Sequence, residues 1–290
     1  MMAERFAVIR WLTRRSRATT CSARSGATDV SVPSLGMDPT ERFTALVQRP
    51  ASELALAEAA LCIAARDHPC DVAAHLATID ALAAEAPGPD LLADHLFTTC
   101  GFAGNAVDYL DPRNSYLDAV LERRVGIPIT LSVVMIEVGR RMGVMIEGVG
   151  MPGHFLVREP TGTYVDPFHG GARLDEEGCR RLFATMHGAA PFRADFLAPV
   201  DDRSILARML ANLTRSFLER HPRDALWTVR LRFAIPGLSI AERRHDATVL
   251  GTLGRFREAS EHLDALATGA DAATAEALGR ESAAYRARAN

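Results

Sequence analysis

Residues 128–142 constrain the fold of this 290-residue chain more than any other segment, because their pattern fits a helix that is apolar on nearly every side. Seven apolar side chains wrap round it: Ile129, Leu131, Val133, Val134, Met135, Ile136 and Val138. Such a helix has no face for solvent, so other elements must cover it on several sides. Pro128 suits the first turn, where a backbone N–H is not needed, and Gly143 suits the end of the helix.

Three strand-like segments follow this helix: residues 145–149, 154–158 and 163–167. The sequence Glu159–Gly162 is a turn signal, so the last two segments are expected to form a hairpin. A three-residue loop places Val157 opposite Val165, both facing an apolar layer. In that register His154 and Asp166 lie on the other face of the sheet as diagonal neighbours, within side-chain reach.

Helical patterns occupy most of the remaining chain. We expect helices from Ser52 to about residue 65, and over 72–86, 90–100, 115–124, 175–187 and from 202 onward. Ser52 fits an N-cap, and Asn114 with Ser115 fits the cap of the helix at 115–124. A helical front, a buried helix and a small antiparallel sheet together indicate an α+β fold.

The last ninety residues contain a weak internal repeat. Asp224-Ala225 and Glu258-Ala259 are 34 residues apart, as are Val229 and Leu263, and 34 is the tetratricopeptide period. Gly254 fits the turn between two helices of such a repeat. The expected domains are 37–200, an α+β core, and 201–290, a tetratricopeptide-like helical tail. Residues 1–36 are rich in Arg, Ser, Thr and Ala, and we interpret them as a disordered extension or a start assigned upstream of Met37 rather than a transit peptide.

Composition narrows the class of protein. The net charge is −3, and no basic stripe with interleaved aromatic residues is present, so a nucleic-acid surface is not expected. No apolar run approaches the roughly 18 residues that would span a bilayer. The five cysteines are widely spaced without a CxxC pair, which predicts neither a zinc site nor a disulfide framework. Thiols in a reducing cytoplasm fit this pattern.

The pair His154 and Asp166 is the arrangement of base and orienting acid in a thiol-based triad, but the thiol is absent. Such hydrolases carry their cysteine at a helix N-terminus, where the helix dipole lowers the thiol pKa. Here that helix begins with Pro128, and no cysteine lies between Cys100 and Cys179. The hydroxyl groups nearest the helix start belong to Thr130 and Ser132, and each would need His154 to remove its proton directly.

Two other interpretations of the pair stay open. His154 can be a structural histidine that pins the hairpin through its hydrogen bond to Asp166, and we favour this interpretation. His169 adds a third potential ligand, and a metal could in principle bind His154, Asp166 and His169. A hairpin does not guarantee that the three converge, so we predict no metal and no cofactor.

Four motifs identify a resemblance: AEAALCIAARDHP, DPRNSYLDAVLERRVGIPITLSVVMIEVGRRMG, GVGMPGHFLVR and YVDPFHGG. In this order they resemble the bacterial SirB-type, transglutaminase-like family, which pairs such a core with a tetratricopeptide-like tail. The resemblance implies a papain-like α+β core, with the base at His154 and the orienting acid at Asp166. It implies a nucleophilic cysteine where this chain has Pro128.

The sequence therefore favours a cytoplasmic, non-catalytic binding or regulatory protein, built on a degenerate transglutaminase-like core. Its expected partner is a protein, held in the cleft or on the tail. The alternative is an amide hydrolase or acyltransferase in which Thr130 or Ser132 acts with His154 and Asp166.

Overall fold

The structure is a computed structural model that describes residues 37–289. The interpretation of residues 1–36, and with it Cys21, lies outside the described residues. The described helices, including 3₁₀ and π segments, are α1 Pro39–Val47, η1 Ala51–Glu53, α2 Leu56–Asp67, α3 Val72–Glu85, η2 Pro89–Leu91, α4 Leu92–Asp94, η3 His95–Thr99, η4 Pro112–Asn114, α5 Leu117–Arg123, α6 Pro128–Arg141, α7 Glu176–His187, η5 Ala194–Leu197, α8 Asp202–Arg220, η6 Pro222–Asp224, α9 Ala225–Phe233, α10 Ile240–Thr252, α11 Phe256–Thr268 and α12 Ala272–Ala289.

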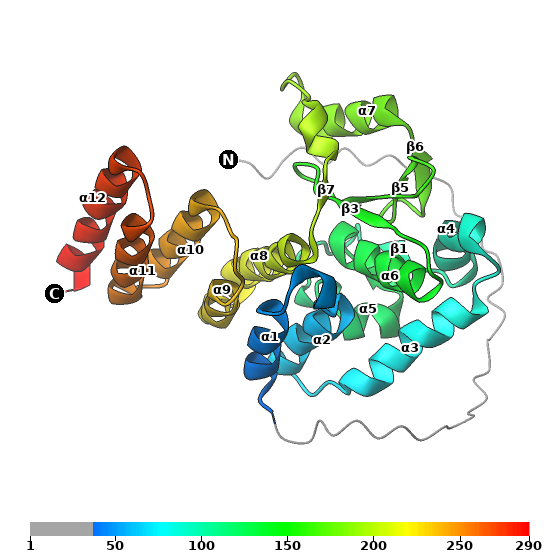
Figure 1. The fold of residues 1–290 in the computed structure, drawn as a ribbon, viewed down its shortest axis with the longest axis horizontal. Coiled ribbons are helices and arrows are strands. Elements are labelled where there is room, and N and C mark those ends of the chain that lie inside the picture. Colours follow the sequence, from blue (N-terminus) through cyan, green and yellow to red (C-terminus); the bar gives the residue numbers. More distant parts are fainter. Residues whose placement is uncertain (1–36, 290) are drawn as a thin grey trace. The chain divides into compact units, whose positions relative to one another are not determined.

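Helix α6 lies at the centre of the fold, as its all-round apolar pattern predicted. Every residue from Pro128 to Gly139 is buried. Helices α2, α3, α5 and α8 contact it, and so do strands β3 (Glu147–Val149) and β4 (Leu156–Arg158) (Figure 1). The helix begins at Pro128, and Gly143 follows its end with a φ of 72°, a left-handed conformation that favours glycine.

A five-stranded antiparallel sheet covers one side of α6, and its strand order is β6-β5-β4-β3-β7. The three strands not yet given bounds are β5 Tyr164–Asp166, β6 Ala172–Leu174 and β7 Pro199–Val200. The predicted hairpin register is confirmed, because Val157 pairs with Val165. Strands β6 and β7 were not predicted, and neither was a two-stranded parallel pair of β1 (Ala103–Gly104) with β2 (Val125–Gly126).

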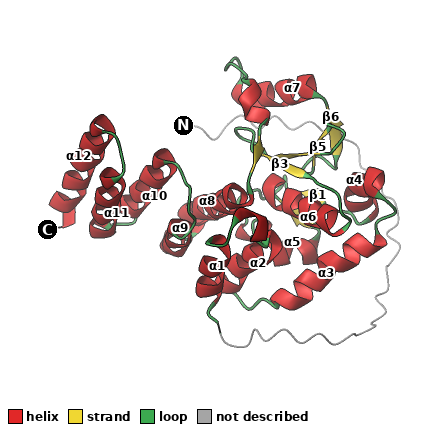
Figure 2. Cartoon of the chain, viewed as in Figure 1, coloured by secondary structure: helices red, strands yellow, loops and turns green. Residues whose placement is uncertain are grey.

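The sheet separates two apolar layers, with α6 on one side and α7 on the other (Figure 1). Val157 and Val165 belong to the large core around α6, as the alternation of side chains along a strand predicted. Leu156 points the other way, into a smaller cluster with Cys179 and Phe183 of α7. The fold class is thus a mainly helical protein with one small antiparallel sheet (Figure 2).

Three predicted helix boundaries were wrong. Ser52 is not an N-cap: it lies in η1, and Leu54 has an extended backbone that separates this turn from α2. Residues 90–100 do not form one helix, because a π-helical segment follows α4 and its last bond runs from Cys100 N–H to the His95 carbonyl. Asn114 caps no helix, since α5 begins at Leu117 after Tyr116.

Helices α8 to α12 follow the sheet. The positions that define the 34-residue repeat, Ala225, Val229, Ala259 and Leu263, are all fully buried. Gly254 has a φ of 74° between α10 and α11, which pack side by side, as α11 and α12 do (Figure 1). The tail is helical as expected. Its assignment to the tetratricopeptide type and the domain boundary at residue 200 stay predictions.

Between residues 37 and 289, no helix combines the length and the apolar character that crossing a bilayer requires.

Candidate functional site

His154 lies two residues before β4, on a short turn that is fixed by hydrogen bonds of its own backbone and from Arg208. Its backbone N–H donates to the Met151 carbonyl at 3.0 Å. Arg208 of α8 donates to the carbonyls of Met151 and His154, at 2.9 and 2.7 Å. Gly153 in this turn has a φ of 77°, which a residue with a side chain rarely adopts. The backbone of His154 is therefore fixed by α8 as well as by the bond within its own turn.

Asp166, the last residue of β5, accepts four hydrogen bonds. Its Oδ2 accepts from Nε2 of His154 at 2.9 Å and from Nδ1 of His169 at 2.7 Å. Its Oδ1 accepts from the backbone N–H groups of Phe168 and His169, at 3.0 and 3.2 Å. The side chains of His154 and Asp166 are 6% and 2% exposed, whereas that of His169 is 56% exposed. The predicted diagonal pair exists, and His169 extends it to the surface.

The electrostatics of the group follow from these bonds. Burial favours the neutral form of Asp166, but the hydrogen bonds from both imidazoles outweigh it and hold the pKa of the carboxyl well below its ordinary value. The hydrogen bond to Asp166 raises the pKa of His169. An ionised carboxylate can only accept, so His154 must carry its proton on Nε2. When His154 is neutral, its Nδ1 is left with a lone pair that could accept a proton.

The hydroxyl groups that His154 would have to deprotonate are not hydrogen-bonded to it. Pro128 is the first residue of α6, where the resemblance implies the cysteine. The hydroxyl of Ser132 donates to the Pro128 carbonyl at 2.8 Å. The hydroxyl of Thr130 is buried and makes no hydrogen bond within residues 37–289. The structure thus brings His154 and Asp166 together but joins neither Thr130 nor Ser132 to them by a hydrogen bond.

The cysteines nearest to α6 in the sequence are Cys100 and Cys179, and neither is bonded to His154. Cys100 Sγ lies 3.5 Å from Nε2 of His95, a different imidazole. Cys179 is fully buried in the apolar layer under α7. Burial, assisted by the negative charge of Asp166, raises the pKa of the Cys179 thiol to about 12. A thiol with that pKa is protonated at neutral pH and is a poor nucleophile.

Sequence reasoning missed the loop that flanks this group. Asn114 is completely buried, and its side-chain amide donates to the Asp108 carbonyl at 2.7 Å. Its carbonyl oxygen accepts from Asn105 at 3.0 Å. These bonds set the loop that carries Tyr109, whose ring meets that of Phe168 edge to face at 5.9 Å. Phe168 in turn meets the His154 ring at 6.2 Å, so the imidazole lies beside an aromatic wall. No signal in the sequence indicated this arrangement, because the burial of Asn114 follows from the tertiary structure.

His154, Asp166 and His169 each offer a ligand atom within 4.8 Å of the others, so their positions allow a metal ion. In the structure as it stands, however, both imidazoles direct an N–H at the same carboxylate oxygen. A shared ion would have to replace both of these hydrogen bonds. The arrangement is complete as a hydrogen-bonded group, and the prediction that no metal binds here is not tested by it.

The comparisons with known proteins give the domain type. Residues 70–211 match the model of the family described as the transglutaminase-like superfamily. The chain carries a transglutaminase-like domain. A UPF0162 protein of Xylella fastidiosa strain Temecula1 is 40% identical over 180 residues, 56% of this chain and 64% of that relative. A UPF0162 protein of strain 9a5c is 48% identical over 126 residues, 41% of this chain and 45% of the relative.

A more distant match is F-box only protein 21 of Mus musculus, which is 34% identical over 129 residues. That match covers 41% of this chain and 20% of the mouse protein. The chain therefore spans less than two thirds of the length of these relatives.

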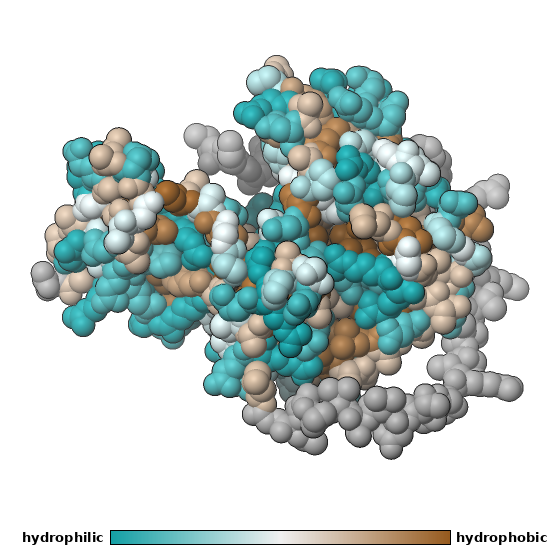
Figure 3. All heavy atoms as spheres, viewed as in Figure 1, coloured by the Kyte–Doolittle hydropathy of each residue, from teal (hydrophilic) through white to brown (hydrophobic). Residues whose placement is uncertain are grey.

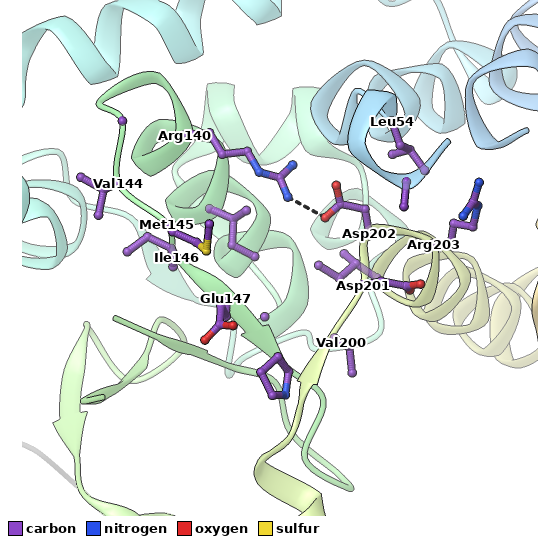
Figure 4. Close-up of a pocket in the computed structure, with 16 residues that line it drawn as sticks. Leu54, Arg140, Val144, Met145, Ile146, Glu147, Val200, Asp201, Asp202 and Arg203 are labelled. Carbon is purple, nitrogen blue, oxygen red and sulfur yellow. Dashed lines mark hydrogen bonds and ion pairs between the residues drawn. The ribbon is translucent and has the colours of Figure 1, made fainter. Parts of the chain in front are cut away.

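A pocket of about 490 Å³ opens at the other end of α6, away from the histidine group of the transglutaminase-like domain. Its lining includes Leu54, Arg140, Met145 and Ile146, and Arg140 pairs with Asp202 across it at 2.7 Å (Figure 4). Apolar atoms also gather near the middle of the face seen in Figure 3, within a mostly hydrophilic surface. Since none of the lining residues belongs to the His154 group, the pocket is not the triad cleft.

Proposed function

We propose that this chain is a non-catalytic, cytoplasmic protein-binding protein of the SirB type, in which a transglutaminase-like core has kept its imidazole–carboxylate pair without a nucleophile. The observation that carries the proposal is that α6 begins with Pro128, at the position where the resemblance implies a cysteine. A second support is the engagement of every acceptor of Asp166 in hydrogen bonds that fix the turn of residues 166–169.

The surface offered to the partner is the outer side of this group. His169 is 56% exposed, and Tyr109 is 38% exposed, so an imidazole and a phenol ring reach solvent on either side of Phe168. Aromatic residues beside polar groups are common at the centres of protein interfaces. Helices α10–α12 add a second surface if they form the tetratricopeptide-like array that the 34-residue spacing indicates.

The claim that the protein is non-catalytic is tested with an amide hydrolysis and acyl-transfer assay. The full chain is incubated with a glutamine-containing peptide, with and without a primary amine, and ammonia release and amine incorporation are measured. We expect no turnover that depends on His154. Ammonia release that disappears in His154→Ala would overturn the proposal and favour an attacking hydroxyl at Thr130 or Ser132.

The claim that the protein binds a protein partner is tested with substitutions on the two proposed surfaces. Deleting residues 201–290 is a poor test, because it also removes Arg208, which holds the His154 turn. Full-length bait is instead compared with Tyr109→Ala, His169→Ala and, on α11, Glu261→Arg. A protein captured by the wild type and lost with one of these variants, at unchanged circular dichroism, supports binding at that surface. Equal capture by all of them contradicts both proposed surfaces.

A further inference from the structure

A second cluster of ligand-type side chains lies on the opposite, helical side of the domain. Cys70 lies in the connection between α2 and α3, His75 in the first turn of α3, and Asp118 in α5. Each contributes one sulfur, nitrogen or oxygen atom, and these three atoms all lie within 4.8 Å of one another. The spacing of the cysteines could not predict this group, because it contains only one cysteine and its aspartate, Asp118, lies 48 residues after Cys70.

The carboxylate of Asp118 is the second, independent observation. The residue is 5% exposed, and its Oδ2 accepts a hydrogen bond from Nε2 of His68 at 2.6 Å. Its Oδ1 is fully buried and has no hydrogen-bond partner of acceptable geometry between residues 37 and 289. A buried carboxylate oxygen whose nearest donor is the weak S–H group of Cys70 is costly, and it is satisfied when it coordinates a cation.

We propose that Cys70, His75 and Asp118 bind a zinc ion, which fastens the connection between α2 and α3 to α5. Sulfur, imidazole nitrogen and carboxylate oxygen together are a ligand set that suits zinc, whereas magnesium and calcium take oxygen ligands. His68 holds the second oxygen of Asp118, which is the role of an outer residue that orients a metal ligand. Glu122, one turn after Asp118, lies 3.8 Å from Nε2 of His75 and adds negative charge beside the site.

Access and protonation are both compatible with such a site. Cys70 and His75 are partly exposed, so an ion can enter from solvent. Burial, together with the charge of Asp118, raises the pKa of the Cys70 thiol to about 12, so the thiol is protonated when no ion is bound. On binding, a Zn–S bond replaces the S–H bond and the proton is released to solvent.

The test is titration of the full chain with Zn²⁺ in competition with a chromophoric chelator, with Co²⁺ as a spectroscopic substitute. We expect one Zn²⁺ per chain and a thiolate-to-cobalt charge-transfer band. Cys70→Ser and Asp118→Asn should remove the band and the tight site, and His68→Ala should weaken binding by about 10–100-fold. His169→Ala and Cys100→Ser are the matched controls, because they alter the other imidazole–carboxylate group and another partly exposed thiol, and they should leave both readouts unchanged.

A measurement on the wild type alone covers the case in which a variant fails to fold. Zn²⁺ should protect Cys70, but not Cys100, from alkylation by iodoacetamide, as read by peptide mass spectrometry. The proposal is overturned if Zn²⁺ gives no protection of Cys70, or if folded Cys70→Ser binds Zn²⁺ as tightly as the wild type. It is also overturned if the only bound ion is lost with His169→Ala.

Discussion

Nε2 of His154 lies 2.9 Å from Oδ2 of Asp166, and both side chains are buried. The same carboxylate oxygen accepts from His169 at 2.7 Å, so one ionised acid orients an inner and an outer imidazole. This relationship joins the hairpin to the turn after it. It leaves Nδ1 of His154 and Nε2 of His169 as the two ring nitrogens that do not bond the carboxylate.

Replacing Asp166 with Asn is expected to lower the free energy of unfolding by about 3 kcal/mol near pH 5, because it leaves two N–H donors facing an amide instead of a carboxylate. The folded pKa of Asp166 is depressed, so its contribution is present above the unfolded pKa of about 4 and is lost as the pH falls further. The folded pKa of His169 is raised, so its smaller contribution is present below about 6.5 and is lost as the pH rises.

The difference between wild type and Asp166→Asn should therefore be largest between about pH 4 and 6.5, as measured by urea unfolding across pH 3–8. His169→Ala is the control, since it should remove the decline above pH 6.5 and keep the decline in acid. A difference that does not vary with pH would show that the charge of Asp166 contributes nothing.

Arg208 is expected to resist replacement by lysine. Its guanidinium donates to the Met151 and His154 carbonyls and lies over the Phe155 ring, 5.5 Å from its centroid. Lysine cannot reproduce this planar contact with two acceptors. Arg208→Lys should cost about 1.5–3 kcal/mol in urea unfolding. Arg280→Lys, in an exposed ion pair with Glu276, should change stability by less than about 0.5 kcal/mol.

Gly104 in β1 is expected to tolerate no side chain. A Cβ at this position would lie 2.5 Å from the carbonyl oxygen of Phe168 and from its ring, next to His169. Gly104→Ala should therefore displace this turn and lower stability by about 1–3 kcal/mol, measured by thermal unfolding. Gly279→Ala is the matched control with the opposite sign, because Gly279 lies in α12 with no atom within 4 Å of an added Cβ. Equal melting points for Gly104→Ala and wild type would contradict the close contact.

The parts of the fold that sequence could predict are those set by local pattern. The apolar pattern of α6 has one solution, a buried helix, and the turn at Glu159–Gly162 fixes the register of Val157 with Val165. That register alone places His154 near Asp166. The geometry of the His154–Asp166 pair could therefore be predicted from the sequence.

The parts that could not be predicted depend on contacts between distant segments. The π-helical segment His95–Thr99, in which the Cys100 N–H bonds the carbonyl of His95 five residues back, interrupts an otherwise α-helical pattern. Cys70 and Asp118 approach only because α3 and α5 pack together, which no spacing reveals. Asn114 looked like a cap in sequence, and its burial in the loop beside Phe168 required the tertiary structure.

A buried ion pair lies among three helices of the tail, α8, α9 and α10. Arg232 of α9 donates to Asp246 of α10 at 2.9 Å and also bonds the Ala207 carbonyl of α8, with both charged side chains less than 5% exposed. Burial raises the pKa of Asp246 despite the opposing charge of Arg232, so the desolvation of this carboxylate is not fully compensated.

Asp246→Ala should therefore lower stability by about 3–5 kcal/mol, since it leaves the Arg232 guanidinium buried without its counter-charge. The double variant Arg232→Met with Asp246→Leu removes both charges and fills the space with apolar atoms, so it should be less destabilised than Asp246→Ala. Urea unfolding of the wild type, of the single variants Arg232→Met and Asp246→Leu, and of the double variant gives the coupling energy directly. Additive effects of the two substitutions would mean that the ion pair does not hold α9 to α10. Apolar packing between the two helices would then stabilise their contact instead.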